Sequence, residues 1–286
     1  MKDKIHIATT IDITYIQHLG VMLCSLFENN LENKFTVYVL VDFKDSALNK
    51  LKIVFNKYKQ ELKVIYIDLA PLKNVKIDGH ISKATYFRLI MPEYLVKFTE
   101  KIIYLDTDII INDNLMPLWQ TDLGKYPLAA VNEGINESKN IFFNAGVLLI
   151  DLRYWIENNI TQKCLEFATN NHEKIILWDQ DVLNEIFKGK WKQLDQKWNV
   201  TSNFLNQTSN KVNDFSQIGI IHFTGALKPW HFHYENPFKD EYFKYLKKTP
   251  WKKFHFKENT LCHHYKQLIK KVVNKLTGKK IFKIYV

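Results

Sequence analysis

The feature that most constrains the fold is a series of six short runs in which apolar residues predominate. Runs of this kind are typical of strands covered on both faces of a sheet. They occupy residues 5–10, 35–42, 63–69, 101–111, 128–133 and 142–152. Segments with apolar residues at helical spacing, 15–28 and 46–59, separate the first three runs, and another, 83–95, follows Ser82. This β-α-β-α-β order predicts an α/β fold with a mostly parallel, doubly wound sheet.

Composition and cysteine content limit the class of protein. The chain of 286 residues is 46% apolar and 14% aromatic, which supplies a globular core and excludes a coiled coil. Cys24, Cys164 and Cys262 share no C-x-x-C spacing, which favours a reducing compartment and argues against structural zinc. No signal peptide opens the sequence, and no run reaches the ~18 apolar residues of a transmembrane helix. We expect a cytoplasmic protein with one domain over residues 1–235 and an appendage over 236–286.

The excess of positive over negative charge is confined to the end of the chain. Residues 1–239 contain 27 basic and 27 acidic residues, whereas residues 240–286 contain 13 and 3. The final stretch also has an apolar stripe at helical spacing with lysines beside it, formed by Tyr265, Leu268, Ile269, Val272, Val273 and Leu276. A basic amphipathic helix of this kind is expected to lie on an anionic membrane, although it could also dock on the body. Because this stretch lacks arginine, we expect no nucleic-acid partner.

The run "KIIYLDTDIII" contains two carboxylates one residue apart, Asp106 and Asp108. Residues two apart in a strand point to the same face, so both side chains could converge on one cation if the strand ends there. The alternative is an ordinary strand end that leads into a turn. Ligands of open α/β sheets bind outside the carboxyl ends of strands, where "IATT" of residues 7–10 would also lie. The G-x-G-x-x-G and G-x-x-x-x-G-K-[ST] loops are absent, which argues against a dinucleotide site or a P-loop.

Four further stretches contain polar residues with both structural and functional interpretations. They are "ISKATYFRLIMPEYL" with Lys83, Tyr86 and Arg88, "FFNAGVLLID" with Asn144 and Gly146, "WDQDVLN" with Asp179, Gln180 and Asp181, and "IIHFTGALKPW" with His222, Gly225 and Lys228. Taken singly, each has a structural explanation. Acidic residues favour helix N-termini, for example, and a lone histidine is more often a core residue than a ligand.

Together and in this order, these stretches resemble glycosyltransferase family 8. This family of retaining sugar-nucleotide transferases includes bacterial lipopolysaccharide galactosyl- and glucosyltransferases and the glycogenins. The resemblance extends from Ile5 to Trp230 and rests on "YLDTD…NAGVLLID…DQDVLN…HFTGALKPW". It implies the A-type glycosyltransferase fold, with the basic helical segment appended at the C-terminus.

The resemblance also implies a donor site and a metal site. Asp106, Asp108 and His222 would bind Mn²⁺, or Mg²⁺ in its place, as a Lewis acid for the departing diphosphate. Lys228 would hold the diphosphate, which Gly225 would let the backbone approach. The other donor positions implied are Ala8, Thr9, Thr10 and Asp12 for uridine, with Lys83, Arg88, Thr107 and Asn144 nearer the phosphates and sugar. Many bacterial members carry an acidic residue where this chain has Thr10, which can still hydrogen-bond uracil.

The position of Gln180 implies how the sugar would be transferred. Asn144, Asp179 and Gln180 match residues that hydrogen-bond the donor sugar, and Gln180 lies where a nucleophile would be expected. Because an amide is a poor nucleophile, we prefer front-face attack with retention, and Asp179 or Asp181 as a covalent nucleophile remains open. The expected function is transfer of galactose or glucose from a UDP-sugar to lipopolysaccharide or another cell-surface glycan, on the inner face of the cytoplasmic membrane. The alternative is a catalytically silent sugar-nucleotide-binding or scaffolding protein of the same fold.

Overall fold

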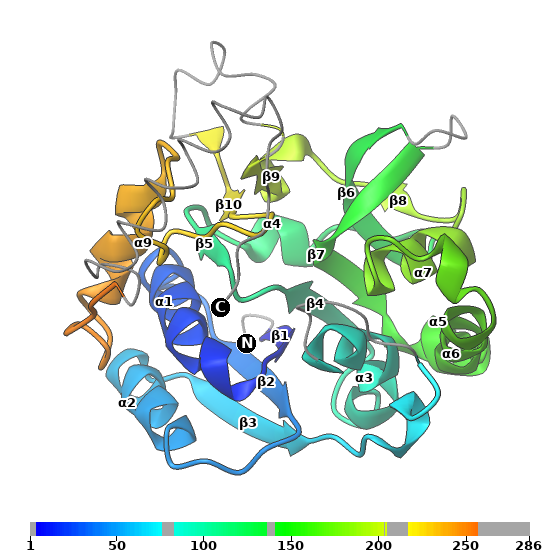
Figure 1. Ribbon diagram of the computed structural model, residues 1–286, viewed down its shortest axis with the longest axis horizontal. Coiled ribbons are helices and arrows are strands. Elements are labelled where there is room, and N and C mark those ends of the chain that lie inside the picture. The colour runs from blue at the N-terminus through cyan, green and yellow to red at the C-terminus, as the bar shows by residue number, and fades with distance from the viewer. Residues whose placement is uncertain (1–3, 76–82, 136–140, 203, 205–216, 257–286) are drawn as a thin grey trace, which may run out of the picture.

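The computed structural model describes residues 4–75, 83–135, 141–202, 204 and 217–256 (Figure 1). The apolar stripe expected over residues 265–276 lies outside these ranges. Within them, no helix combines the length and the apolar character that crossing a membrane requires.

A seven-stranded sheet forms the centre of the molecule, with the strand order β3-β2-β1-β4-β7-β6-β8. Its first four strands are parallel, β7 runs antiparallel to both β4 and β6, and β8 is parallel to β6. The bounds are β1 Ile5–Thr10, β2 Phe35–Val41, β3 Glu61–Tyr66, β4 Lys101–Leu105, β6 Leu128–Ile135, β7 Ile141–Asp151 and β8 Lys192–Gln193. This mixed α/β sheet, parallel in most of its pairings, confirms the predicted fold class.

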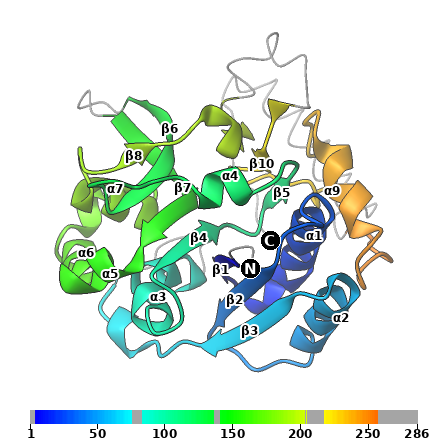
Figure 2. The same ribbon diagram turned by 180° about the vertical axis from the view of Figure 1, so that it is seen from behind.

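Helices cover both faces of the sheet (Figures 1 and 2). Because side chains alternate along a strand, Val37 and Val39 of β2 belong to one buried cluster while Tyr38 and Leu40 belong to the other. The first face is covered by α1 Ile16–Glu28, α2 Leu48–Tyr58 and α9 Lys239–Leu246. The second is covered by α3 Phe87–Leu95, α5 Leu152–Glu157, α6 Ile160–Asn170 and α7 Asp179–Ile186. The short elements are α4 Met116–Trp119 and the 3-10 turns η1 Ile13–Tyr15, η2 Ala70–Leu72, η3 Lys83–Tyr86, η4 His172–Lys174 and η5 Gln196–Trp198.

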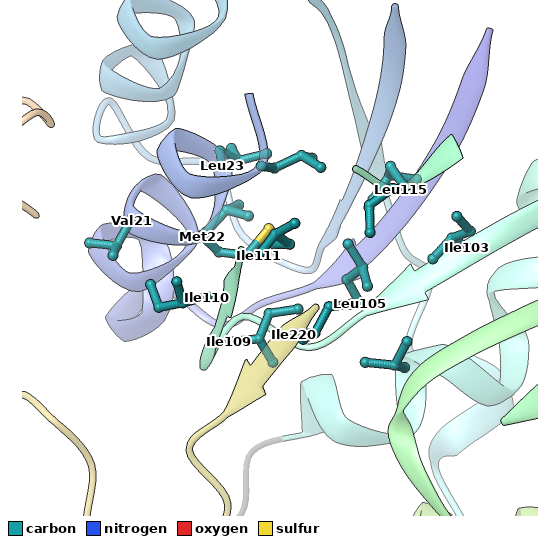
Figure 3. Close-up of a cluster of buried hydrophobic side chains, with 14 of the residues drawn as sticks. Val21, Met22, Leu23, Ile103, Leu105, Ile109, Ile110, Ile111, Leu115 and Ile220 are labelled. Carbon is teal, nitrogen blue, oxygen red and sulfur yellow. The ribbon is translucent and has the colours of Figure 1, made fainter. Parts of the chain in front are cut away.

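The run 101–111, predicted as one strand, is two strands in two different sheets. After β4 the chain turns at Asp106–Asp108 and continues as β5 Ile109–Ile111 in a three-stranded sheet with β10 Ile220–His222 and β9 Val200–Thr201. The backbone N–H of Asp106 donates to Gly146 O at 2.8 Å, and Asp108 O accepts from Phe223 N at 3.0 Å. Apolar side chains of β4, β5, β10 and α1 fill the junction between the two sheets (Figure 3). The single-strand prediction was wrong because an apolar run does not reveal which sheet each part joins.

The described part of the C-terminal segment packs on the body of the molecule. Tyr242, Tyr245 and Leu246 of α9 are buried in the same cluster as α1. The Trp251 ring lies so close to Gly20 that a Cβ there would come within 2.5 Å of it. Glycine in α1 therefore admits the indole. The boundary at residue 235 stays a prediction, and packing against α1 continues beyond it.

Candidate functional site

Two carboxylates and an imidazole converge where the two sheets meet. Asp106 and Asp108 lie in the turn between β4 and β5, and His222 lies at the end of β10, where it pairs in register with Ile109. His222 Nε2 is 3.3 Å from Asp108 Oδ1 and 3.7 Å from Asp106 Oδ2. One ligand atom from each of the three residues lies within 4.8 Å of the others. The antiparallel pairing of β5 with β10 therefore brings together residues that are far apart in the sequence.

The surroundings of this cluster fit a divalent cation. Two carboxylate oxygens and one imidazole nitrogen form a mixed donor set that suits Mn²⁺ or Mg²⁺. Gly146 of β7 borders the cluster, and a Cβ at this position would lie 2.2 Å from His222 Cε1 and 2.7 Å from Asp106 Oδ2. Only glycine leaves room for both side chains at this point of the strand.

Arg88 is a buried cation that joins two of the acidic groups. Its Nη2 donates to Asp106 Oδ1 at 2.9 Å, its Nε lies 2.5 Å from Asp179 Oδ2, and its Nη1 donates to Ala145 O. Burial lowers the pKa of the guanidinium, but the carboxylates of Asp106 and Asp179 outweigh this effect and raise the pKa above its usual value. Arg88 therefore remains charged and fixes one oxygen of Asp106, whose other oxygen faces His222.

Asp179 titrates in an unusual range. Burial raises its pKa, the Asp106 carboxylate adds to this effect and the Arg88 guanidinium opposes it, and the net pKa is about 7. The side chain is 3% exposed at the first position of α7. The preceding residue, Trp178, has a φ of 54°, which is strained for a residue with a side chain.

Lys228 compensates the charge of the second carboxylate. Its ammonium donates to Asp108 Oδ2 and to Phe223 O, the latter at 2.6 Å. Burial raises the pKa of Asp108, but Lys228 and His222 outweigh it and hold the pKa well below its usual range. Gly225 has a φ of 90°, a backbone conformation that favours glycine, and directs the chain from β10 towards Lys228.

The side chains of Glu133, Asn144 and Gln180 form a hydrogen-bonded group beside the cluster of Asp106, Asp108 and His222. Asn144 Nδ2 donates to Glu133 Oε2 at 2.8 Å, and Gln180 Nε2 lies 3.5 Å from the same oxygen. Gln180 Oε1 accepts from the backbone N–H of Ala145 at 3.0 Å. A small cavity beside this group is lined by Val131, Asn132, Glu133, Asn144, Gln196, Asn199, Thr201 and Phe204.

The carboxyl end of β1 reaches the site through Tyr104. Thr10 Oγ1 and Tyr104 Oη are 3.0 Å apart, and Tyr104 donates to Asp106 Oδ1 at 3.0 Å. Ala8 and Thr9 are fully buried in β1. Asp12 Oδ1 accepts from Thr14 N at 2.8 Å and thus caps the turn that precedes α1.

The structure brings most of the candidate residues together, but not all. Arg88, Asp106, Asp108, Asp179, His222 and Lys228 form one connected set of close contacts between charged and polar side chains. Thr107 is buried within the turn. The exposed Lys83 has no described contact with this set, and Asp181 Oδ2 accepts from the backbone N–H groups of Ile176 and Leu177.

Sequence reasoning missed three residues of this site. Glu133 ends the apolar run 128–133, Asn199 follows the "QKW" turn and Tyr104 lies inside β4. Tyr104 opens the "YLDTD" motif, whereas Glu133 and Asn199 belong to none of the quoted motifs. A weaker signal was present for Glu133, an acidic residue at the end of a predicted buried strand, and none for Asn199.

Comparison with known proteins decides the family. The family model described as "Glycosyl transferase family 8" matches residues 6–233, which is most of the chain. This chain belongs to glycosyltransferase family 8. The assignment confirms the resemblance of the five motifs and identifies the cluster at the sheet junction as part of a glycosyltransferase domain.

This family 8 chain is similar to characterised relatives along most of its length. It is 28% identical over 274 residues to general stress protein A of Bacillus subtilis, covering 87% of this chain and 96% of the relative. It is 27% identical over 291 residues to a lipopolysaccharide 1,2-glucosyltransferase of Escherichia coli, covering 94% and 86%. Its fold matches that of the galactosyltransferase LgtC, solved with donor and acceptor sugar analogues, with a TM-score of 0.77 and 23% identity over 86% of this chain and 96% of that one. This match confirms the predicted A-type glycosyltransferase fold.

Proposed function

We propose that this glycosyltransferase is a metal-dependent, retaining hexosyltransferase that moves galactose or glucose from a UDP-sugar to a glycan acceptor. The observation that carries the proposal is the convergence of Asp106, Asp108 and His222 next to Lys228 and Arg88. Three ligands of mixed O/N type beside two cations suit a metal–diphosphate pair. We assign the catalytic residues to 1–235, against which α9 packs, and membrane contact to the basic residues of the segment 236–286.

The roles of the residues follow from charge and geometry. A bound Mn²⁺ or Mg²⁺ would act as a Lewis acid for the departing diphosphate. Lys228, at the mouth of the cluster, would exchange its partner Asp108 for a phosphate oxygen. Thr10 and Asp12 at the carboxyl end of β1 would bind uridine, and the buried Ala8 and Thr9 would form the strand end behind them. Arg88 stays charged and holds Asp106 in place through its hydrogen bond to Oδ1.

The group around Gln180 supports front-face attack over a covalent intermediate. The carbonyl oxygen of Gln180 already accepts from Ala145 N, so the amide is held as a binding group. Asp179 is ion-paired with Arg88, and Asp181 is occupied by two backbone N–H groups. Glu133 adds a carboxylate that would accept from sugar hydroxyls. In this mechanism the acceptor attacks on the side of the departing diphosphate, which gives retention.

The proposed acceptor rests on the name of one relative and on the positive charge of the C-terminal residues. One relative is a lipopolysaccharide glucosyltransferase by name, and this chain matches 86% of it. The basic C-terminal residues would hold the enzyme on an anionic bilayer, where a membrane-borne glycan is presented. We therefore propose lipopolysaccharide or another cell-surface glycan as the acceptor, with the enzyme on the cytoplasmic side of the membrane.

The test is a panel of UDP-sugars with Mn²⁺, in which release of UDP is followed. Turnover should stop with EDTA and return when Mn²⁺ is added. Asp108→Asn should lower kcat roughly a thousandfold because it removes a metal ligand and leaves Lys228 without its partner. Asp113→Asn, at a half-exposed position where the carboxylate pairs with Lys197 and accepts from Asn114 N, is the matched control and should retain activity.

Two outcomes would overturn the proposal. Full activity in EDTA would exclude the metal, and a β-linked product would exclude retention. Binding of UDP-sugars without turnover of any of them, including slow hydrolysis, would favour the catalytically silent sugar-nucleotide-binding protein instead.

A further inference from the structure

Asn199 is a fully buried amide that lines the cavity beside Asn144 and has so far been given no role in donor or metal binding. It follows η5, its side chain has 0% exposure, and its backbone bonds to Gln196. Its Nδ2 donates to Asn144 Oδ1 at 2.8 Å, and its Oδ1 lies 2.9 Å from His222 Nδ1. A buried amide is costly unless both ends are hydrogen-bonded, and Asn199 has both ends bonded to residues of the site.

The orientation of Asn144 is fixed from its two ends. The backbone N–H of Gly146, which can only donate, points at Asn144 Oδ1 at 2.9 Å. The other end of the amide, Nδ2, donates to Glu133 Oε2 at 2.8 Å, and a carboxylate can only accept. Asn144 Oδ1 is therefore an acceptor, so the atom of Asn199 that contacts it is the donor Nδ2.

The orientation of Asn199 then decides which nitrogen of His222 carries hydrogen. With Nδ2 directed at Asn144, Asn199 presents its carbonyl Oδ1 to His222, and only an Nδ1–H can bond to it. His222 Nε2 is the nitrogen that faces Asp106 and Asp108. In the neutral ring that tautomer leaves the Nε2 lone pair directed at the carboxylates.

We propose that Asn199 is a positioning residue that holds His222 as the Nδ1–H tautomer, so that Nε2 is presented as a metal ligand. The chain of hydrogen bonds runs from the Gly146 N–H through Asn144 and Asn199 to His222. A neutral amide accepts this hydrogen without placing another negative charge beside two carboxylates. The inference rests on the metal site proposed above, and partners of this kind orient metal-ligating histidines and tune their affinity.

The first measurement is the tautomer of His222 in the metal-free full-length chain. Long-range ¹⁵N–¹H correlation spectra of histidine-labelled protein, recorded at a pH where the ring is neutral and with His222 assigned by its loss in His222→Gln, should show hydrogen on Nδ1 and none on Nε2. Hydrogen on Nε2 of the neutral ring would overturn the inference without bearing on the enzyme's activity. This measurement needs no variant at position 199.

The second measurement is Mn²⁺ binding, followed by the free-ion signal in electron paramagnetic resonance, with Mn²⁺ alone and with UDP. Asn199→Leu, which has a similar size but no acceptor, should weaken Mn²⁺ binding by about tenfold to a hundredfold. Asn199→Asp keeps an acceptor for Nδ1–H and should recover part of this loss. Asn33→Leu removes another buried amide, bonded to Asn30 and Asn114, and should leave Mn²⁺ binding unchanged.

The outcomes separate the inference from the proposed function. Unchanged Mn²⁺ affinity in a folded Asn199→Leu would overturn the inference while the metal site stands. A wild-type chain that binds no Mn²⁺ in either condition would overturn the metal site, whatever the tautomer. An Nδ1–H tautomer together with a selective loss of affinity in Asn199→Leu would support both.

Discussion

The two oxygens of Asp106 have different partners. Oδ1 accepts from Arg88 and from Tyr104, whereas Oδ2 lies 3.7 Å from His222 Nε2. Hydrogen bonds from two buried groups fix the carboxylate in one orientation, so its remaining oxygen is presented to the cluster without reorganisation. Precision of this kind depends on close packing around the side chains, which makes the residues bordering the cluster as important as the ligands.

Gly146→Ala tests this packing. The added methyl group would lie 2.2 Å from His222 Cε1, and His222 cannot move away freely because Asn199 holds its other side. We expect the free energy of unfolding to fall by about 1–3 kcal/mol and UDP release to fall at least about tenfold. Gly189→Ala is the control, because its φ of 67° strains the backbone but nothing lies within 4 Å of the new Cβ. Unfolding midpoints and activity both like wild type in Gly146→Ala would contradict the described contact.

The raised pKa of Asp179 predicts how stability depends on pH. An unfolded aspartate titrates near 3.9, whereas burial raises the pKa of folded Asp179 to about 7. Between these values the folded chain binds more protons than the unfolded chain. Its contribution to stability is therefore present at low pH and is lost as pH rises towards 7, by at most roughly 1.4 kcal/mol per pH unit.

Asp179→Asn removes this titration and should flatten that part of the profile. Urea unfolding of both chains in EDTA, at about pH 5, 6, 7 and 8, measures the difference in slope. Other titrating groups are common to both chains and cancel in the comparison. Parallel profiles across this window would show that Asp179 titrates in its ordinary range.

At the level of secondary structure, α9 packs against the segment that contains Lys228 and helps to hold it in position. Trp230 stacks on His18 of α1 with ring centroids 3.5 Å apart and lies 5.3 Å from the ring of Tyr242 of α9. Tyr242 Oη also bonds His18 Nδ1 at 2.7 Å. Because Trp230 follows Lys228 by two residues, α1 and α9 together anchor the loop that presents the ammonium to Asp108.

Truncation separates this anchoring role from the role of the last residues. A chain that ends at Phe256 keeps α9 and the contacts of the Phe256 ring with Phe232 and Phe243. We expect it to retain the thermal midpoint and to release UDP with a soluble acceptor at a rate within about twofold of wild type. A chain that ends at Glu235 loses the buried residues of α9 and should unfold at a clearly lower temperature and lose activity. Equal stability of the two truncated chains would contradict the anchoring role.

At the scale of the whole molecule, charge is distributed unevenly along the chain. Residues 257–286 contain eight lysines and one glutamate, whereas residues 1–239 carry equal numbers of basic and acidic residues. Such an asymmetry supplies long-range attraction to an anionic surface without altering the charge balance around the donor site.

Binding to lipid vesicles tests this distribution. The full-length chain should sediment with vesicles that contain anionic lipid and much less with neutral ones, because each lysine near the surface contributes about 1 kcal/mol. Raised salt should weaken the association, since it screens surface charge. The chain that ends at Phe256 is the matched control and should remain in the supernatant. A full-length chain that ignores anionic vesicles at low salt would favour docking of the C-terminal stretch on the protein.

Most of the elements, and the two carboxylates of the turn at Asp106–Asp108, can be predicted from the sequence alone. Continuous apolar runs such as 35–42 and helical spacing over 15–28 are local patterns, and burial and periodicity dictate them residue by residue. Asp106 and Asp108 were recognisable because two carboxylates inside an apolar run are costly without a function. The ordered motifs then identified the family, which the family match over residues 6–233 confirms.

How these residues meet depends on contacts between distant segments of the chain. Lys228 pairs with Asp108 across 120 residues, because β5 leaves the main sheet and pairs with β10. The roles of Asn199 and Glu133 depend on the same arrangement of strands, since each acts through a side chain on another strand. Register and sheet membership are set by packing between distant segments, which leaves no periodic trace in the local sequence. The residue types can therefore be identified from the sequence, whereas their partners are known only from the fold.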